Sequence, residues 1–87
     1  MQGLFEDINN FNGHIEKWDV SNVTNMSYMF NNAFSFNQPL NNWDVSKVKD
    51  MHCMFYRAKL FNQPISNWDV SNCNNMGNMF TYAYSFN

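Results

Sequence analysis

The sequence predicts an α/β solenoid in which each 25-residue turn carries one short parallel strand and one short helix. The first observation is a repeat, because the segment Trp-Asp-Val-Ser begins at Trp18, at Trp43 and at Trp68, with constant spacing. A fixed period of this size is typical of chains in which each repeat buries its apolar face against its neighbours. The second observation is that an apolar pattern of period two and one of helical period alternate within each repeat.

The repeats account for the whole chain and leave no linker. Residues 1–17 form a partial repeat, and full repeats start at the three tryptophans, so residues 1–87 are predicted to form a single domain of about three and a half turns. Hydrophobic residues make up 45% of the chain and charged residues 14%, which is the composition of a folded protein. Asn supplies about one residue in five and tolerates left-handed backbone, which favours tight turns.

The predicted strands lie around the tryptophans. In the middle repeat, Trp43 and Val45 are expected to point inward, and both residue types favour strands. The equivalent segments begin at Ile15, Leu40 and Ile65.

A helix is predicted after each strand. Residues 51–58 carry apolar side chains at i, i+3, i+4 and i+7, which forms one stripe on a helix. Asp50 precedes the stripe as a candidate N-cap, and Asn25 and Asn75 occupy the same place in the neighbouring repeats. Pro64, in the turn Phe-Asn-Gln-Pro, fixes φ and prevents the helix from continuing.

Stacking the repeats brings like side chains into columns that form the predicted core. The columns are Trp18, Trp43 and Trp68; Phe30, Phe55 and Phe80; and Phe36, Phe61 and Phe86.

The full pattern Phe-Asn-Gln-Pro-Leu/Ile-x-Asn-Trp-Asp-Val-Ser-x-Val-x-x-Met-x-x-Met-Phe resembles a known repeat. The similar family consists of bacterial surface proteins and mycoplasma-type lipoproteins, relatives of the BspA-like leucine-rich repeats. This resemblance implies a leucine-rich-repeat-like solenoid with a role in surface display, adhesion or protein interaction, and it implies no catalytic residues. The secretion signal usual in that family is not seen in residues 1–7, which carry two acidic side chains, so the sequence leaves the localisation open.

Asp19, Asp44 and Asp69 form the column that most resembles a site. Neighbouring strands lie about 4.8 Å apart, so the three carboxylates would repel one another. Two explanations remain open. Each carboxylate accepts hydrogen bonds from the serine or turn amides just downstream, or a cation such as calcium binds between the carboxylates.

Other chemistry finds little support. His14 and His52 occupy unrelated repeat positions without a Ser or Cys partner, so neither an enzyme nor a bound cofactor is predicted. Two Cys and two His match no zinc pattern; Cys53 is predicted at the surface and Cys73 in the core. The net charge of −2 argues against nucleic-acid binding, and no apolar run approaches the ~18 residues of a membrane span.

We therefore expect a non-enzymatic protein-interaction or surface-display module, or alternatively a structural spacer made rigid by a cation at the Asp column. The repeats differ mainly on the helix side, where aromatic and basic residue types that are enriched at interface hot spots appear. Surface aromatics without any partner are the competing interpretation. The candidate partner-binding residues are Tyr28, Tyr56, Arg57, Lys59, Tyr82 and Tyr84. Uncovered strand edges also predict end-to-end self-association, or else a dependence on flanking sequence that is absent from this chain.

Overall fold

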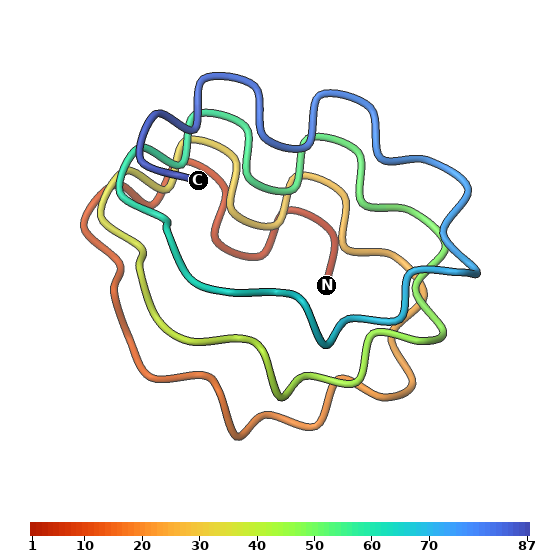
Figure 1. Ribbon diagram of the computed structural model, residues 1–87. Coiled ribbons are helices and arrows are strands. Elements are labelled where there is room, and N and C mark those ends of the chain that lie inside the picture. Colours follow the sequence, from red (N-terminus) through yellow and green to blue (C-terminus); the bar gives the residue numbers. More distant parts are fainter.

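The chain closes one circuit every 25 residues, and successive circuits lie on one another (Figure 1). The computed structural model describes residues 1–87 and contains no helix and no strand; isolated parallel bridges join Asp50 to Asn25 and to Asn75. The predicted α/β solenoid with leucine-rich-repeat-like helices and strands is therefore wrong. The molecule is instead a compact, loop-rich structure of 28 × 26 × 23 Å. We call its circuits layers, and they cover residues 1–12, 13–37, 38–62 and 63–87.

Each predicted helix is replaced by two consecutive β-turns. In residues 26–33, the amide of Met29 donates to the carbonyl of Met26 at 3.3 Å, and Tyr28, the third residue of this turn, has a φ of 60°. Asn32 repeats this left-handed geometry in the second turn, also at 60°. A positive φ at the third position is the mark of a type II turn. We call the four equivalent stretches tandem-turn segments: residues 1–8, 26–33, 51–58 and 76–83.

The tandem turns reproduce the apolar spacing that predicted a helix. The side chains at i, i+3, i+4 and i+7 of the third layer are fully buried, namely Met51, Met54, Phe55 and Ala58. Two turns of four residues repeat a side-chain direction almost as a helix does, so apolar spacing alone does not separate the two structures. The hydrogen bonds do separate them, because alternate amides bond to the next layer rather than to the carbonyl four residues back.

These interlayer bonds form rows that run in one direction. The amide of Tyr28 donates to the His52 carbonyl at 2.9 Å, and the amide of Phe30 donates to the Met54 carbonyl at 2.8 Å. One layer further on, the same row is formed by the amides of Cys53, Phe55 and Arg57, which donate to the carbonyls of Gly77, Met79 and Thr81. Within the tandem-turn segments, alternate amides therefore point toward the following layer, in the direction of the fourth. The accepting carbonyls point toward the preceding layer, in the direction of the first.

The predicted N-cap residues do accept backbone amides. The Oδ1 atoms of Asn25, Asp50 and Asn75 each accept the amide two residues downstream, at 2.9, 2.9 and 3.0 Å. This is the geometry of an Asx turn, which Asn and Asp adopt readily. The polar residues thus begin a local structure as predicted, but that structure is a pair of β-turns.

The segments around the tryptophans do not pair as strands. No backbone hydrogen bond joins these segments of adjacent layers; instead, the indole Nε1 of Trp43 donates to the Ile15 carbonyl at 3.0 Å. The inward direction was predicted correctly, since Trp43 and Val45 are 3% and 1% exposed. The Trp column is incomplete as a core element, however, because Trp18 is 42% exposed.

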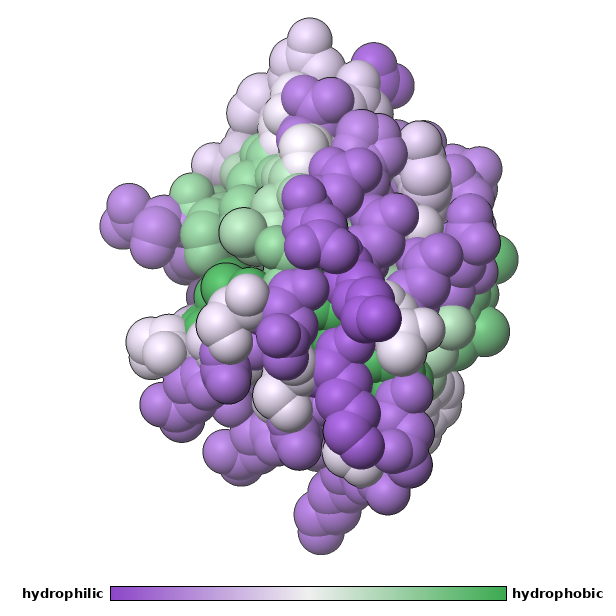
Figure 2. Space-filling model, turned by 90° about the vertical axis from the view of Figure 1, so that its right-hand side faces the viewer, coloured by the Kyte–Doolittle hydropathy of each residue, from purple (hydrophilic) through white to green (hydrophobic).

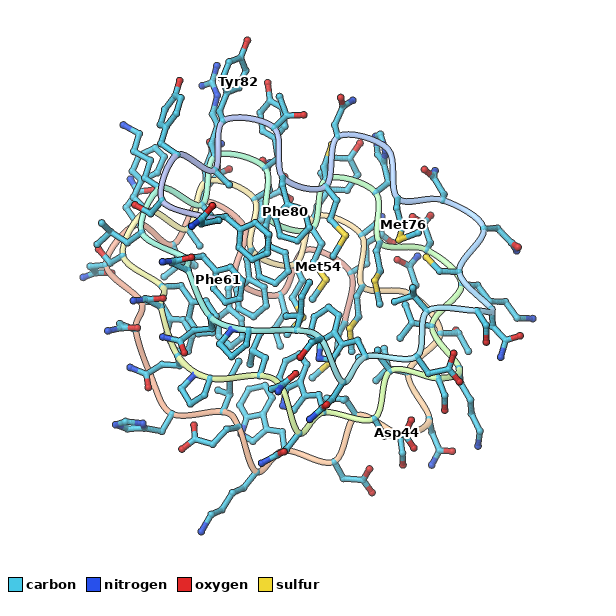
Figure 3. All side chains as sticks on the ribbon, viewed as in Figure 1. Asp44, Met54, Phe61, Met76, Phe80 and Tyr82 are labelled. Carbon is cyan, nitrogen blue, oxygen red and sulfur yellow. The ribbon has the colours of Figure 1, made fainter.

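The phenylalanine columns predicted from the repeat are present and form the centre of the molecule. Phe55 stacks on Phe30 at 5.3 Å and on Phe80 at 5.4 Å between ring centroids, and it contacts Phe61 of its own layer at 4.2 Å. Phe61, Phe80 and Met54 all lie inside the circuits (Figure 3). Stacked rings of this kind contribute about 0.5–1.5 kcal/mol each beyond their burial.

Candidate functional site

The tandem turns direct several of the candidate side chains outward. Arg57 and Tyr82 occupy the left-handed third position of their turns, with φ of 59° and 60°, as Asn32 does one layer earlier. Left-handed backbone costs about 1–2 kcal/mol at residues other than Gly, Asn and Asp. At positions 57 and 82, Arg and Tyr stand where the second layer has Asn32, and the chain tolerates the strain. Both side chains lie on the outside of the molecule.

Arg57 lies between two tyrosine rings. Its guanidinium carbon is 5.5 Å from the ring centroid of Tyr56 and 5.5 Å from that of Tyr82. The two rings meet edge to face, with 5.6 Å between centroids and an interplanar angle of 81°. Both distances are within the range of cation–π attraction, so the rings hold the guanidinium in place.

A second basic residue completes the group beside a shallow depression. The Nζ atom of Lys59 is 4.5 Å from the centre of the Phe34 ring, and Tyr84 lies 6.1 Å from Tyr82. The depression has a volume of about 210 Å³ and is lined by Phe34, Arg57, Lys59, Tyr82 and Tyr84. We call these five residues together with Tyr56 the aromatic–cationic cluster. Figure 3 shows Tyr82 projecting away from the core.

The two basic groups of this cluster have no acidic neighbour. The one contact at ion-pair distance in the molecule lies between His14 and Glu16, at 3.7 Å, so neither Arg57 nor Lys59 is paired with a carboxylate. Tyr82 and Tyr84 are 48% and 73% exposed. The cluster therefore presents unpaired positive charge and exposed aromatic surface side by side.

The structure brings together five of the six predicted binding residues. Tyr28 lies apart from them and packs edge to face on His52, with 5.4 Å between ring centroids. Phe34, which was not among the predicted residues, joins the cluster. The repeat did contain the signal, because Phe34, Lys59 and Tyr84 share one repeat position.

The aspartates of the column accept local hydrogen bonds. Asp44 Oδ1 accepts the hydroxyl of Ser46 at 2.6 Å and its amide at 3.0 Å, and Asp19 accepts the same two bonds from Ser21. In all three copies, hydrogen bonds from the serine hold the pKa of the aspartate below its ordinary value. The bond from the serine hydroxyl has the larger effect and the bond from its amide the smaller. No group of three or more His, Cys, Asp or Glu side chains is arranged to hold a metal ion.

These carboxylates should make stability depend on pH in a defined window. A lowered pKa in the folded state stabilises the fold above the unfolded value of 3.8, and this contribution is lost as the pH falls through the folded value. We expect Ser21→Ala, Ser46→Ala and Ser71→Ala combined to reduce stability at pH 6 and to weaken its dependence on pH below 4. Urea unfolding at both pH values measures this. An unchanged pH dependence would contradict the assignment, and a rise in melting temperature with calcium would favour the cation.

The cysteines differ from their predicted environments. Cys53, predicted at the surface, is 8% exposed, and burial raises the pKa of its thiol. Cys73, predicted in the core, is half-buried, and both thiols are free. Cys53 has a left-handed φ of 54°, as Tyr28 and Asn78 have at the same repeat position.

Comparison with known proteins gives one match. The family model described as Mycoplasma protein of unknown function, DUF285, matches residues 1–87. No curated protein and no solved structure matches the chain. The match agrees with the mycoplasma-type part of the resemblance, whereas the leucine-rich-repeat part finds no support in a structure without helices or strands. The structure also contains no helix that could cross a membrane.

Proposed function

We propose that this chain, which belongs to the DUF285 family of Mycoplasma proteins of unknown function, is a non-enzymatic protein-interaction module. Its binding surface would be the aromatic–cationic cluster, and its partner would present an acidic segment. The observation that carries the proposal is the placement of Arg57 between two tyrosine rings with no carboxylate beside it.

The geometry suits a carboxylate that approaches from solvent. The rings of Tyr56 and Tyr82 restrain Arg57, so less side-chain entropy is lost when the guanidinium binds an anion. Arg and Tyr are among the residue types that dominate binding energy at protein interfaces. The exposed ring of Tyr84 adds apolar contact area next to the charge. An acidic side chain flanked by apolar groups would use both features.

The aspartate side of the molecule is a poorer candidate. Its carboxylates already accept hydrogen bonds from serines of the same layer, and Asp-Val-Ser recurs unchanged in each full repeat. A surface that repeats itself in this way offers a partner little basis for discrimination. Figure 3 shows that Asp44 and Tyr82 project from different sides of the molecule, so the two surfaces can be tested independently.

The test uses the repeat's own residues as replacements. Tyr56→Asn with Arg57→Asn installs the residues found at positions 31 and 32, and Asn tolerates the left-handed φ that position 57 requires. A fluorescein-labelled glutamate-rich peptide serves as the probe, and fluorescence anisotropy reports binding. We expect the double variant to bind the probe about tenfold more weakly, which corresponds to about 1.4 kcal/mol.

The matched control is Lys49→Asn, which removes one positive charge outside the cluster and installs the residue found at position 74. This variant should bind the probe like the wild type. Equal weakening by both variants would show that net charge alone attracts the peptide. Loss of binding in Asp44→Asn, with the double variant intact, would move the binding surface to the aspartate side.

A further inference from the structure

Asn12 is the one asparagine of the chain that is followed by glycine, Gly13. Hydrophilic residues form much of the face seen in Figure 2, and asparagine is the most frequent polar residue of the chain. The residues at the repeat position of Asn12 in the next two layers are Asn37 and Asn62, and glutamine follows each of them. The repeat therefore offers two internal references for the behaviour of Asn12.

These three asparagines form a ladder in which each makes the same hydrogen bond. The Oδ1 atoms of Asn12, Asn37 and Asn62 accept the backbone amide of the asparagine one layer further on, at 2.8, 2.9 and 3.1 Å. The backbone amide of the residue that follows each asparagine donates no hydrogen bond. Each position thus combines a side-chain carbonyl held by a donor with a free amide directly after it in the chain.

We propose that Asn12 is a site of spontaneous deamidation through a cyclic succinimide. The backbone nitrogen of Gly13 loses its proton to hydroxide from the solvent and attacks the Cγ atom of Asn12. A bond forms between these two atoms, and the bond from Cγ to Nδ2 breaks as Nδ2 takes a proton from water and leaves as ammonia. Water then opens the ring at either of its two carbonyls, which leaves aspartate or isoaspartate at position 12.

Two features of the structure favour this reaction at Asn12. The amide of Asn37 donates to Oδ1, where negative charge develops during the attack, as the donors of an oxyanion hole do. Glycine has no Cβ, so the attacking nitrogen of Gly13 is uncrowded and its backbone can turn toward Cγ. The first feature is shared by all three asparagines of the ladder, whereas the second is confined to Asn12. We therefore expect Asn12 to react much faster than the other two.

The isoaspartate product would weaken the link between the first and second layers. Asn12 accepts two hydrogen bonds from the second layer, one at Oδ1 from the amide of Asn37 at 2.8 Å and one at its carbonyl from Nε2 of Gln38 at 3.2 Å. In isoaspartate the main chain runs through the former side chain and is longer by one methylene group, so both acceptors are displaced. The aspartate product keeps both acceptors and adds only a negative charge.

Peptide mapping by mass spectrometry, after incubation of the folded chain in mildly alkaline buffer, tests the proposal. Asn12 should be converted at least about tenfold faster than Asn37 and Asn62, which corresponds to a difference of about 1.4 kcal/mol in the barrier. Gly13→Gln installs the residue of the other repeats and should slow the conversion of Asn12 to the rate of Asn37.

A second variant moves the reactive pair to another layer. A Cβ at position 13 would lie 2.8 Å from Cε1 of Phe11, so Gly13→Gln requires the Phe11 ring to move. Gln63→Gly has no such requirement. It places glycine after Asn62 and should accelerate conversion at Asn62 by a factor similar to the advantage of Asn12. Conversion of Asn12 at the rate of Asn37, or an unreactive Asn62 in Gln63→Gly, would overturn the proposal.

Thermal unfolding tests the consequence for the layers. The isoaspartate form, separated from the incubated wild type by chromatography, should melt at a lower temperature than the fresh protein. The matched control is Asn12→Asp, which carries the added charge without the longer main chain and should melt like the wild type. An isoaspartate form that melts at the same temperature as Asn12→Asp would overturn the inferred loss of the link between the layers.

Discussion

Phe55→Ala is expected to lower the free energy of unfolding by about 3–5 kcal/mol, a large part of the roughly 4–13 kcal/mol that a chain of this length possesses. Phe55 is fully buried and contacts four aromatic rings, namely Phe30, Phe61, Phe80 and Trp68. Its removal leaves a cavity that the rigid turns around it cannot close. Urea denaturation at low protein concentration, where association is absent, measures the loss.

The last layer supplies the matched control for this substitution. Phe80 occupies the same repeat position and contacts Phe86 of its own layer, but it is only partly buried and has Phe55 as its one neighbour in the column. Phe80→Ala should therefore cost about half as much as Phe55→Ala, because fewer packing contacts are lost. Equal costs for the two substitutions would show that the column is not the centre of the core.

Trp43→Ala is expected to cost about 3–5 kcal/mol for two separable reasons. The substitution empties a buried site and leaves the Ile15 carbonyl without the indole donor at 3.0 Å. Trp43→Phe keeps most of the ring volume and should isolate the hydrogen bond, with a cost of about 1–2 kcal/mol. Thermal unfolding of both variants separates the two contributions.

Trp18→Ala is the control for position 43. Trp18 is 42% exposed and its indole donates no hydrogen bond to another layer, so its removal should cost less than Trp43→Ala by at least about 2 kcal/mol. A loss as large as that of Trp43→Ala would mean that the layers are not held together in the way the hydrogen bonds indicate.

The repeat in the sequence was sufficient to predict which side chains lie inside. Met51, Met54, Phe55 and Ala58 are buried as their spacing indicated, and Trp43 and Val45 point inward. The backbone could not be predicted in the same way, because helices and tandem type II turns produce the same apolar spacing. The left-handed residues decide between them, and the residue types of Gly3, Asp7, Asn32 and Asn78 adopt this conformation readily. Tyr28, Cys53, Arg57 and Tyr82 adopt it although their residue types disfavour it.

The interlayer hydrogen bonds explain why unfavourable residues accept this conformation. Tyr28, Cys53 and Arg57 each donate their own amide to the next layer, at 2.9, 3.0 and 2.9 Å, whereas the amide of Tyr82 in the last layer has no such acceptor. A bond of this kind contributes about 1 kcal/mol, which is comparable to the local strain. The balance depends on the stack as a whole, so it is not visible in the sequence of any one repeat.

The candidate site was partly predictable from the repeat, because its residues differ from one repeat to the next. Differences between repeats at exposed positions identified Tyr56, Arg57 and Tyr82, which the structure places in contact. The predicted helix did not separate Tyr28 from the other candidates, because it placed all of them on one side of the molecule. The actual separation arises from the neighbouring layer: the ring packed beside Tyr28 is that of His52, whereas Tyr56 has Tyr82.

The central claim is that rows of alternate amides bind each layer to the next, and amide hydrogen exchange tests it most directly. At low protein concentration, the amides of Phe30 and Phe55 should be strongly protected, whereas that of Phe80, at the same repeat position, should exchange quickly. Equal protection at all three positions, or protection that follows the i to i−4 pattern of a helix across residues 51–58, would contradict the account.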